Sequence, residues 1–300
     1  MTERERVIQI VDALAPELKT LALNIHDNPE LGLQEFKACA WQKELLAKYG
    51  FQIEDDFCNL ETAYKAVYKG KKQGPKIAFL AEYDALPGLG HGCGHNLIAM
   101  VAVGCGIACR EFADKYGAEI DVIGTPAEET AGTKVPMSAM GVFKDYDAVM
   151  MAHPMFSNTD CFNSIAMDAY QIEFFGKPAH AANTPYEGIN ALDAMINFFN
   201  LINAMRQETK PDARIHGVIT DGGKAANIIP DYTAASFYIR ANRVADVKQL
   251  AERVRNCAAG AALATGCTYR MEYNEENFKD TVRNHVLPRF VYRYTADSTG

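Results

Sequence analysis

The chain has 300 residues, 48% of them hydrophobic, which is enough to bury the core of one large domain or two medium-sized ones. Its formal net charge of −8 argues against nucleic acid or an anionic membrane as a partner. The charged N-terminus has no signal-peptide core, no run approaches a membrane span, and the eight cysteines include no Cys-x-x-Cys pair, so we expect a cytoplasmic protein with reduced thiols.

Helices and strands alternate in the first half of the chain. Apolar residues at helical spacing predict two N-terminal helices, and apolar runs predict four strands with a helix of small residues between the second and third. This alternation is typical of an α/β domain with a mostly parallel core. The helices are expected at 4–24, 34–49 and 96–115, and the strands at 62–69, 76–82, 119–124 and 147–152.

Residues 77–96 carry the densest group of chemically active side chains. An apolar strand ends on two acidic residues, and a glycine-rich loop with His91, Cys93 and His95 follows. Thiolate and imidazole are preferred ligands of zinc and similar ions, and the alternating glycines let such ligands turn inward. The loop continues into an apolar helix, for which Asn96 is the expected N-cap. The pattern is that of half a metal site at the C-terminal end of a strand.

Other interpretations of this loop are available. The dinucleotide fingerprint requires glycines at positions one, three and six, but the sixth residue is Cys93 counted from Gly88 and His95 counted from Gly90. No Lys-Ser or Lys-Thr pair follows, which disfavours a phosphate loop. For the loop considered alone, a structural turn with an inert buried cysteine remains open.

Ligand-type side chains also follow two further expected strands. Glu128 and Glu129 come after the strand at 119–124, and His153 comes after the strand at 147–152. In open α/β sheets, ligands bind beyond the carboxyl ends of the strands. Two adjacent glutamates or one histidine would be ordinary surface features. Here, however, three strand ends all offer thiolate, imidazole or carboxylate groups. This coincidence indicates a metal-assisted hydrolase.

The pattern changes near residue 167 to the order β-α-β-β-α-β, which is a ferredoxin-like unit. A further helical stretch is expected at 279–292. If that stretch rejoins the first domain, then residues 1–166 and 274–300 form a catalytic domain, and residues 167–273 are an insertion whose two ends lie close together. The elements of the insertion are expected at 167–175, 188–206, 214–220, 232–240, 244–264 and 267–273.

These residues resemble the aminoacylase/carboxypeptidase metallopeptidases (peptidase family M20). The branch concerned includes aminobenzoyl-glutamate hydrolases, β-alanyl-lysine-type dipeptidases and indole-acetyl-amino-acid hydrolases. Several motifs occur in family order. They are His-Asp-Asn-Pro-Glu-Leu-Gly at 26–32, Asp-Ala-Leu-Pro with Gly-Cys-Gly-His-Asn at 84–96, Pro-Ala-Glu-Glu at 126–129, His153, Gly-Lys-Pro-Ala-His-Ala at 176–181, Asn-Ile-Ile-Pro at 227–230, and Arg240.

The resemblance implies a role for each side chain of the first domain. Glu128 would be the general base that takes a proton from metal-bound water, and Asp84 would orient a ligand. A complete member would bind two divalent ions per subunit, zinc or manganese, which lower the pKa of bound water. Older branches have a histidine at the position of Glu82, and the Cys-x-His pair is expected to replace it. The metal ligands would be Cys93, His95, Glu129 and His153.

The inserted unit resembles the family's lid and dimerisation domain, which implies a homodimer. His180 would reach the partner subunit's active site and stabilise the oxyanion, and Asn227 and Arg240 would bind the substrate's carboxylate or carbonyl. Without the resemblance, we would interpret these three residues as a capping histidine, a turn asparagine and an arginine that extends along a strand.

The expected function is therefore hydrolysis of an amide bond next to a free carboxylate. The substrate would be an N-acyl amino acid, a dipeptide or an aminobenzoyl-glutamate type of molecule. Family members continue with a glycine-rich segment and a final histidine ligand, whereas this chain ends at Thr-Ala-Asp-Ser-Thr-Gly and His285 does not match that ligand. The alternative expectation is a truncated, inactive relative that retains only dimerisation or binding.

Overall fold

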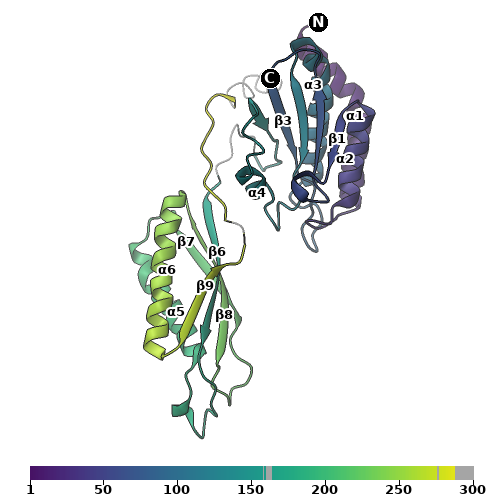
Figure 1. The fold of residues 1–300 in the computed structure, drawn as a ribbon. Helices are drawn as coiled ribbons and strands as arrows, with labels where there is room; N and C mark the ends of the chain where they lie inside the picture. Colours follow the sequence, from purple (N-terminus) through teal and green to yellow (C-terminus); the bar gives the residue numbers. More distant parts are fainter. Residues whose placement is uncertain (158, 160–163, 276, 288–300) are drawn as a thin grey trace. The chain divides into compact units, whose positions relative to one another are not determined.

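The computed structural model describes residues 1–157, 159, 164–275 and 277–287 (Figure 1). They belong to two compact units, Met1–Ser157 and Asn158–Gly300. Each unit has its own sheet and its own hydrophobic core.

A five-stranded sheet with the order β1-β2-β4-β3-β5 forms the centre of the first unit. The last three strands in this order are parallel, whereas β2 is antiparallel to β4 and β1 is antiparallel to β2. The predicted α/β class with a parallel core is therefore confirmed. The sequence did not predict β1, because its four residues are mostly exposed and show no apolar run. The strands are β1 (Gln52–Asp55), β2 (Tyr64–Lys69), β3 (Lys76–Ala81), β4 (Glu119–Gly124) and β5 (Ala148–Met150).

Helices cover both faces of this sheet. α1 (Glu3–Asp27), α2 (Phe36–Lys48) and α3 (His95–Tyr116) share one core with β2, β3 and β4. The short helix α4 (Lys134–Ala139) lies on the other side in Figure 1. There the segment after it packs on the second, smaller cluster around Leu80 and Ile123 of β3 and β4.

α3 is the central helix of the first unit. It is long and apolar enough to cross a membrane by length and composition, but it packs against α1, β3 and β4 like a core helix. It begins at His95, because Gly94 adopts a positive φ of 84° that turns the chain into the helix. The expectation that Asn96 is the N-cap is therefore wrong. Its buried amide instead donates to the carbonyl oxygen of Ala22 in α1, at 3.2 Å.

The second unit is a four-stranded antiparallel sheet with the order β7-β8-β6-β9 and two helices packed on one face. The chain order β-α-β-β-α-β confirms the predicted ferredoxin-like unit. Alternate residues of the strands enter the core beneath the helices, so the intervening residues point to the opposite face. The elements are β6 (Ala166–Phe175), α5 (Ala191–Met205), β7 (Arg214–Asp221), β8 (Tyr232–Ala241), α6 (Val244–Thr265) and β9 (Thr268–Tyr273), with 3-10 turns at Pro185–Glu187 and Arg206–Glu208.

Of the helix expected at 279–292, the described residues 279–286 are not helical, Leu287 is helical, and residues 288–292 lie outside the described part. His285 is among the residues that are not helical. The two valines of this stretch, Val282 and Val286, are 89% and 65% exposed. A short helix depends on burial of an apolar face, and these two exposed valines provide none over residues 279–286.

A close approach between α3 and β4 generates a test of this packing. A Cβ atom on Gly106 would lie 2.4 Å from Cγ2 of Val122. Because Val122 is completely buried, it has no room to move. We expect Gly106→Ala to lower the free energy of unfolding by about 1–3 kcal/mol despite the better helix propensity of alanine. Urea denaturation followed by circular dichroism measures this change.

Gly260→Ala in α6 is the matched control. The added Cβ would meet only Cδ1 of Leu201 at 3.6 Å, which is an ordinary contact. The substitution should raise the free energy of unfolding by about 0.5–1 kcal/mol. If both substitutions stabilise the protein, the packing of α3 against β4 does not require a glycine at position 106.

Candidate metal centre

The parallel strands of the first unit end at one edge of the sheet. Glu82 and Asp84 follow β3, Glu128 and Glu129 follow β4, and His153 follows β5. β3 pairs in parallel with both of the other strands, so the three loops leave the sheet side by side. The topology thus gathers acidic and imidazole side chains in one place.

His95 lies at the centre of this group and is completely buried. Its Nδ1 is 3.0 Å from the backbone oxygen of Asp84 and 3.0 Å from Oδ1 of the same residue. Both neighbours are acceptors, so Nδ1 carries the hydrogen and Nε2 presents a lone pair. Nε2 lies 3.9 Å from Oε2 of Glu128 and 3.7 Å from Oε1 of Glu129.

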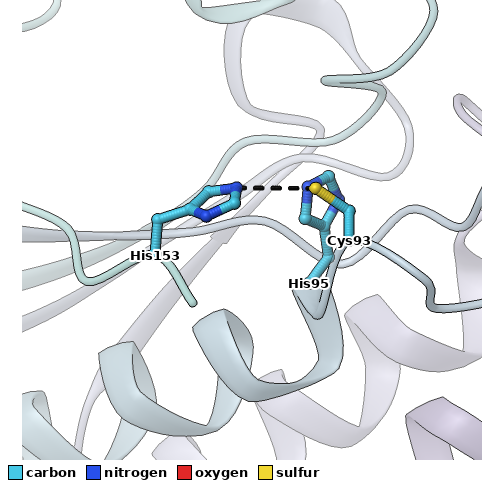
Figure 2. Close-up of side chains that lie close together, drawn as sticks. All are labelled: Cys93, His95 and His153. Atoms are coloured by element: carbon cyan, nitrogen blue, oxygen red, sulfur yellow. Dashed lines mark hydrogen bonds between the residues drawn. The ribbon is translucent and has the colours of Figure 1, made fainter. Parts of the chain in front are cut away.

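Cys93 and His153 meet on another side of His95. The distance from Cys93 Sγ to His153 Nε2 is 3.6 Å, and Figure 2 shows the three side chains converging. His153 Nδ1 lies 2.8 Å from the carbonyl oxygen of Pro154 and donates to it. Its Nε2 is therefore the acceptor nitrogen, directed at the thiol. The rings of His95 and His153 lie edge to face with centroids 5.9 Å apart.

The ligand atoms form two groups that share His95. Cys93, His95 and His153 make one group, and His95, Glu128 and Glu129 make the other, with all ligand atoms of a group within 4.8 Å of one another. Nε2 of His95 and Oε2 of Glu82 are buried without a hydrogen-bond partner in the described part of the chain. Buried acceptors without donors fit a bound cation, and thiolate, imidazole and carboxylate are the donors that zinc-like ions take. Within the described residues, His91 belongs to neither group.

Two buried carboxylates hold the loop that carries the glutamates. Oδ2 of Asp84 accepts from the backbone nitrogen of Glu129 at 2.9 Å. Oε1 of Glu35 accepts from the backbone nitrogen of Ala127 at 2.7 Å, and its Oε2 accepts from Thr62 at 3.0 Å. Ala127 has a positive φ of 56°, a conformation that needs such support in a residue other than glycine. Sequence analysis did not predict a role for Glu35. Its position three residues after the 26–32 motif could have indicated one.

Burial and the neighbouring carboxylates shift the pKa values of the side chains in the candidate metal centre. Burial raises the pKa of Glu128, and the neighbouring charge of Glu82 raises it further. Burial, with Glu129 beside the thiol, raises the pKa of Cys93 to about 12. Burial alone would lower the pKa of His95, but the hydrogen bond to Asp84 and the charge of Glu82 outweigh burial and raise it. The arrangement therefore favours the binding of a cation.

Sequence analysis treated Glu82 only as the residue at a position where older branches have a histidine ligand, and it did not predict a partner for this carboxylate. Its side chain is buried, with 1% of the residue exposed. Lys134, the first residue of α4, donates to its Oε1, and its Oε2 lies 3.4 Å from Nε2 of His95. The centre thus contains a lysine–carboxylate ion pair beside the candidate ligands.

In the second unit, His180 and Asn227 lie together. The backbone nitrogen of Ala181 donates to the oxygen of Asn227 at 3.0 Å, and His180 forms an isolated bridge with Ile228. Nδ1 of His180 accepts from the backbone nitrogens of Ala182 and Asn183, both at 3.2 Å. Its exposed ring therefore carries the hydrogen on Nε2 and can donate it.

Arg240 lies far from that pair. It is close to the end of β8 and pairs with Met167 at the start of β6, whereas Asn227 precedes the beginning of β8 at Tyr232. The eight steps along the strand from Tyr232 to Arg240 span about 26 Å. The guanidinium lies 5.4 Å from the ring centroid of Tyr238, and its Nε is buried with no hydrogen-bond partner among the described residues.

Comparisons with known proteins place this geometry in a family. Residues 167–265 match the model of the peptidase dimerisation domain. The chain is 35% identical to the Xaa-Arg dipeptidase of Mus musculus over 300 residues, covering 95% of this chain and 69% of that protein. It is 33% identical to a p-aminobenzoyl-glutamate hydrolase chain of Escherichia coli (strain K12), covering 91% of this chain and 60% of that protein.

Solved structures share the fold. A putative aminohydrolase from methicillin resistant Staphylococcus aureus matches with a TM-score of 0.83 at 20% identity, covering 98% of this chain and 84% of that one. A dinuclear metal binding peptidase of the M20 family from Bacillus subtilis matches with a TM-score of 0.73 at 20% identity, covering 96% and 81%. Together with the sequence identity to the dipeptidases, these matches show that the chain belongs to the M20 family of metal-dependent peptidases and amidohydrolases.

Proposed function

We propose that this protein hydrolyses an amide bond next to a free carboxylate, in a dipeptide or an N-acyl amino acid. The observation that carries the proposal is the convergence of two ligand groups on His95. The similarity to an Xaa-Arg dipeptidase and an aminobenzoyl-glutamate hydrolase favours a substrate whose scissile amide precedes a C-terminal amino acid. It also favours an enzyme over the alternative of a chain that only dimerises or binds.

Cys93, His95, Glu129 and His153 would hold one or two divalent ions, zinc or manganese. Such an ion polarises the scissile carbonyl and lowers the pKa of a water molecule when it is bound. The protein fixes the geometry in advance: Asp84 orients His95, and the carbonyl of Pro154 orients His153.

Glu128 would be the general base. Its Oε2 lies 3.9 Å from Nε2 of His95, so it borders the centre. Burial and the nearby charge of Glu82 raise its pKa, which makes proton acceptance easier than for an exposed carboxylate. After taking the proton of the attacking water, Glu128 would pass it to the leaving nitrogen.

The second unit would supply the groups that bind substrate. His180 would donate its Nε2 hydrogen to the carbonyl oxygen as negative charge develops there. Arg240, whose Nε has no partner in the described chain, would bind the free carboxylate by charge-assisted hydrogen bonds. Asn227 lies beside His180 and would act with it.

The spacing of these groups supports a homodimer. A dipeptide is much shorter than the stretch of β8 that separates Arg240 from Asn227, so one bound substrate cannot contact both residues of one chain. Two copies resolve this, because one chain can supply Arg240 to a site and its partner can supply His180 and Asn227. β7 is an edge strand with Val218 64% exposed and Ile219 42% exposed, which suits pairing with a second chain.

Replacement of the base tests the mechanism. We expect Glu128→Gln to lower kcat by about 10²–10⁴-fold, because the amide side chain cannot accept the proton. Metal content by elemental analysis should stay unchanged. Assays use a panel of dipeptides, N-acyl amino acids and aminobenzoyl-glutamate, and Glu129→Gln is the comparison because it should lose metal. Loss of metal with retained turnover in Glu128→Gln would mean that the two glutamates have the opposite roles.

Subunit mixing tests the shared site. A His180→Ala chain and a Glu128→Gln chain should each be nearly inactive alone. After exchange at equal concentrations, about half of the dimers are mixed and each contains one intact composite site, so about a quarter of wild-type activity should return.

Two further mixtures serve as controls for this experiment. Asn227→Ala mixed with His180→Ala should recover nothing, because both residues serve the same site. Asn227→Ala mixed with Glu128→Gln should recover as His180→Ala does. Failure of every mixture to recover, with subunit exchange proven by mass spectrometry, would rule out a site shared between chains.

A further inference from the structure

Glu82 and Lys134 form a pair inside the candidate metal centre that the ligand and base assignments do not use. Glu82 comes directly after β3, and Lys134 begins α4 after the loop with the two glutamates. The lysine side chain is 25% exposed and the carboxylate side chain 2%, so the ion pair is largely sheltered from water. Thr133 donates to the oxygen of Pro126 and closes the loop that positions Lys134.

The two oxygens of Glu82 have different environments. Oε1 accepts from Lys134, whereas Oε2 has no hydrogen-bond partner within the residues that the structure describes and lies 3.4 Å from Nε2 of His95. Because Nδ1 of His95 carries the hydrogen toward Asp84, Nε2 presents a lone pair. Two buried atoms that lack a hydrogen-bond partner among the described residues therefore face each other; a proton on Nε2 would satisfy both, and so would a metal cation that takes its place between or beside them.

Lys134 makes this arrangement possible. Glu82, Asp84, Glu128 and Glu129 bring four carboxylates around one imidazole, and the lysine pairs with Glu82. The ion pair offsets one buried negative charge and fixes one oxygen of Glu82. The free oxygen is thereby held against His95 and cannot rotate to find another partner.

We propose that Lys134 and Glu82 are a positioning pair of the metal centre, in which Lys134 holds Oε1 and Glu82 presents Oε2 to the cation bound by Nε2 of His95. The inference rests on the proposed metal centre and adds two residues to it. Lys134 acts through Glu82, and Glu82 contributes charge and geometry to the ion.

Cobalt binding tests the pair without reference to turnover. Co²⁺ is titrated into metal-free protein, with the Kd measured by calorimetry and ligand geometry measured by the visible absorption of the ion. Glu82→Gln and Lys134→Met should each weaken the Kd about 10–100-fold and change the visible bands. Lys134→Arg should restore part of both. Lys144→Met, at a lysine ten residues further along the chain and outside the centre, should match the wild type.

Thermal unfolding with Co²⁺ and with a chelator separates positioning from simple stability. A structural ion pair would lower the melting temperature equally in both conditions. A positioning pair must reduce the increase in melting temperature that the metal produces, because that increase follows metal affinity.

The outcomes distinguish the two proposals. If the wild type binds no Co²⁺, the proposed metal centre itself is wrong. If the wild type binds Co²⁺ and the Glu82→Gln and Lys134→Met variants bind it with the same Kd and spectrum, the metal centre stands and the positioning role is overturned.

Discussion

The buried carboxylate of Asp84 connects the parts of the candidate centre. One oxygen accepts from His95 at the start of α3, and the other accepts from the backbone of Glu129 after β4. Removing a carboxylate from water is costly unless its oxygens are satisfied, and here both are satisfied by groups from other loops. Asp84 therefore stabilises a single relative position of the glycine loop, the glutamate loop and the end of β3. In that position, the hydrogen bond to Asp84 places the hydrogen of neutral His95 on Nδ1 and leaves the lone pair on Nε2.

The same arrangement gathers several carboxylates in the centre, and the single positive charge of Lys134 does not balance them. Lys134 pairs with Glu82, while Glu128 and Glu129 lie within 4 Å of the imidazole nitrogen. Mutual repulsion of this kind destabilises the metal-free fold locally and is relieved when a divalent cation binds. The backbone anchors at Glu35 and Asp84 prevent the loops from moving apart to relieve it. The crowded carboxylates thus lower the stability of the metal-free fold at this point and raise its affinity for a cation.

Local patterns predicted the elements and their order well, because apolar periodicity reports burial directly. The strand from Glu119 to Gly124 was predicted with the same bounds, and ligand types after strands indicated the centre. Contacts between distant segments could not be predicted in this way. Glu35 reaches Ala127 across 92 residues, and Lys134 reaches Glu82 across 52. Asn96 shows that a local signal can also mislead. Its side chain is of a type suited to capping, but the residue lies inside the helix. The helix begins one residue earlier because Gly94, before His95, turns the chain there.

The length of β8 bears on the homodimer proposed above. A ferredoxin-like sheet has strands of about ten residues, so its two ends are separated by more than the length of a small substrate. His180 and Asn227 occupy loops at one end and Arg240 lies at the other, and no rotamer change can bring them together. If all three residues bind one substrate, the rigid strand requires that they come from two chains. Under the proposed function, the length of one strand would then make two chains necessary for binding one substrate.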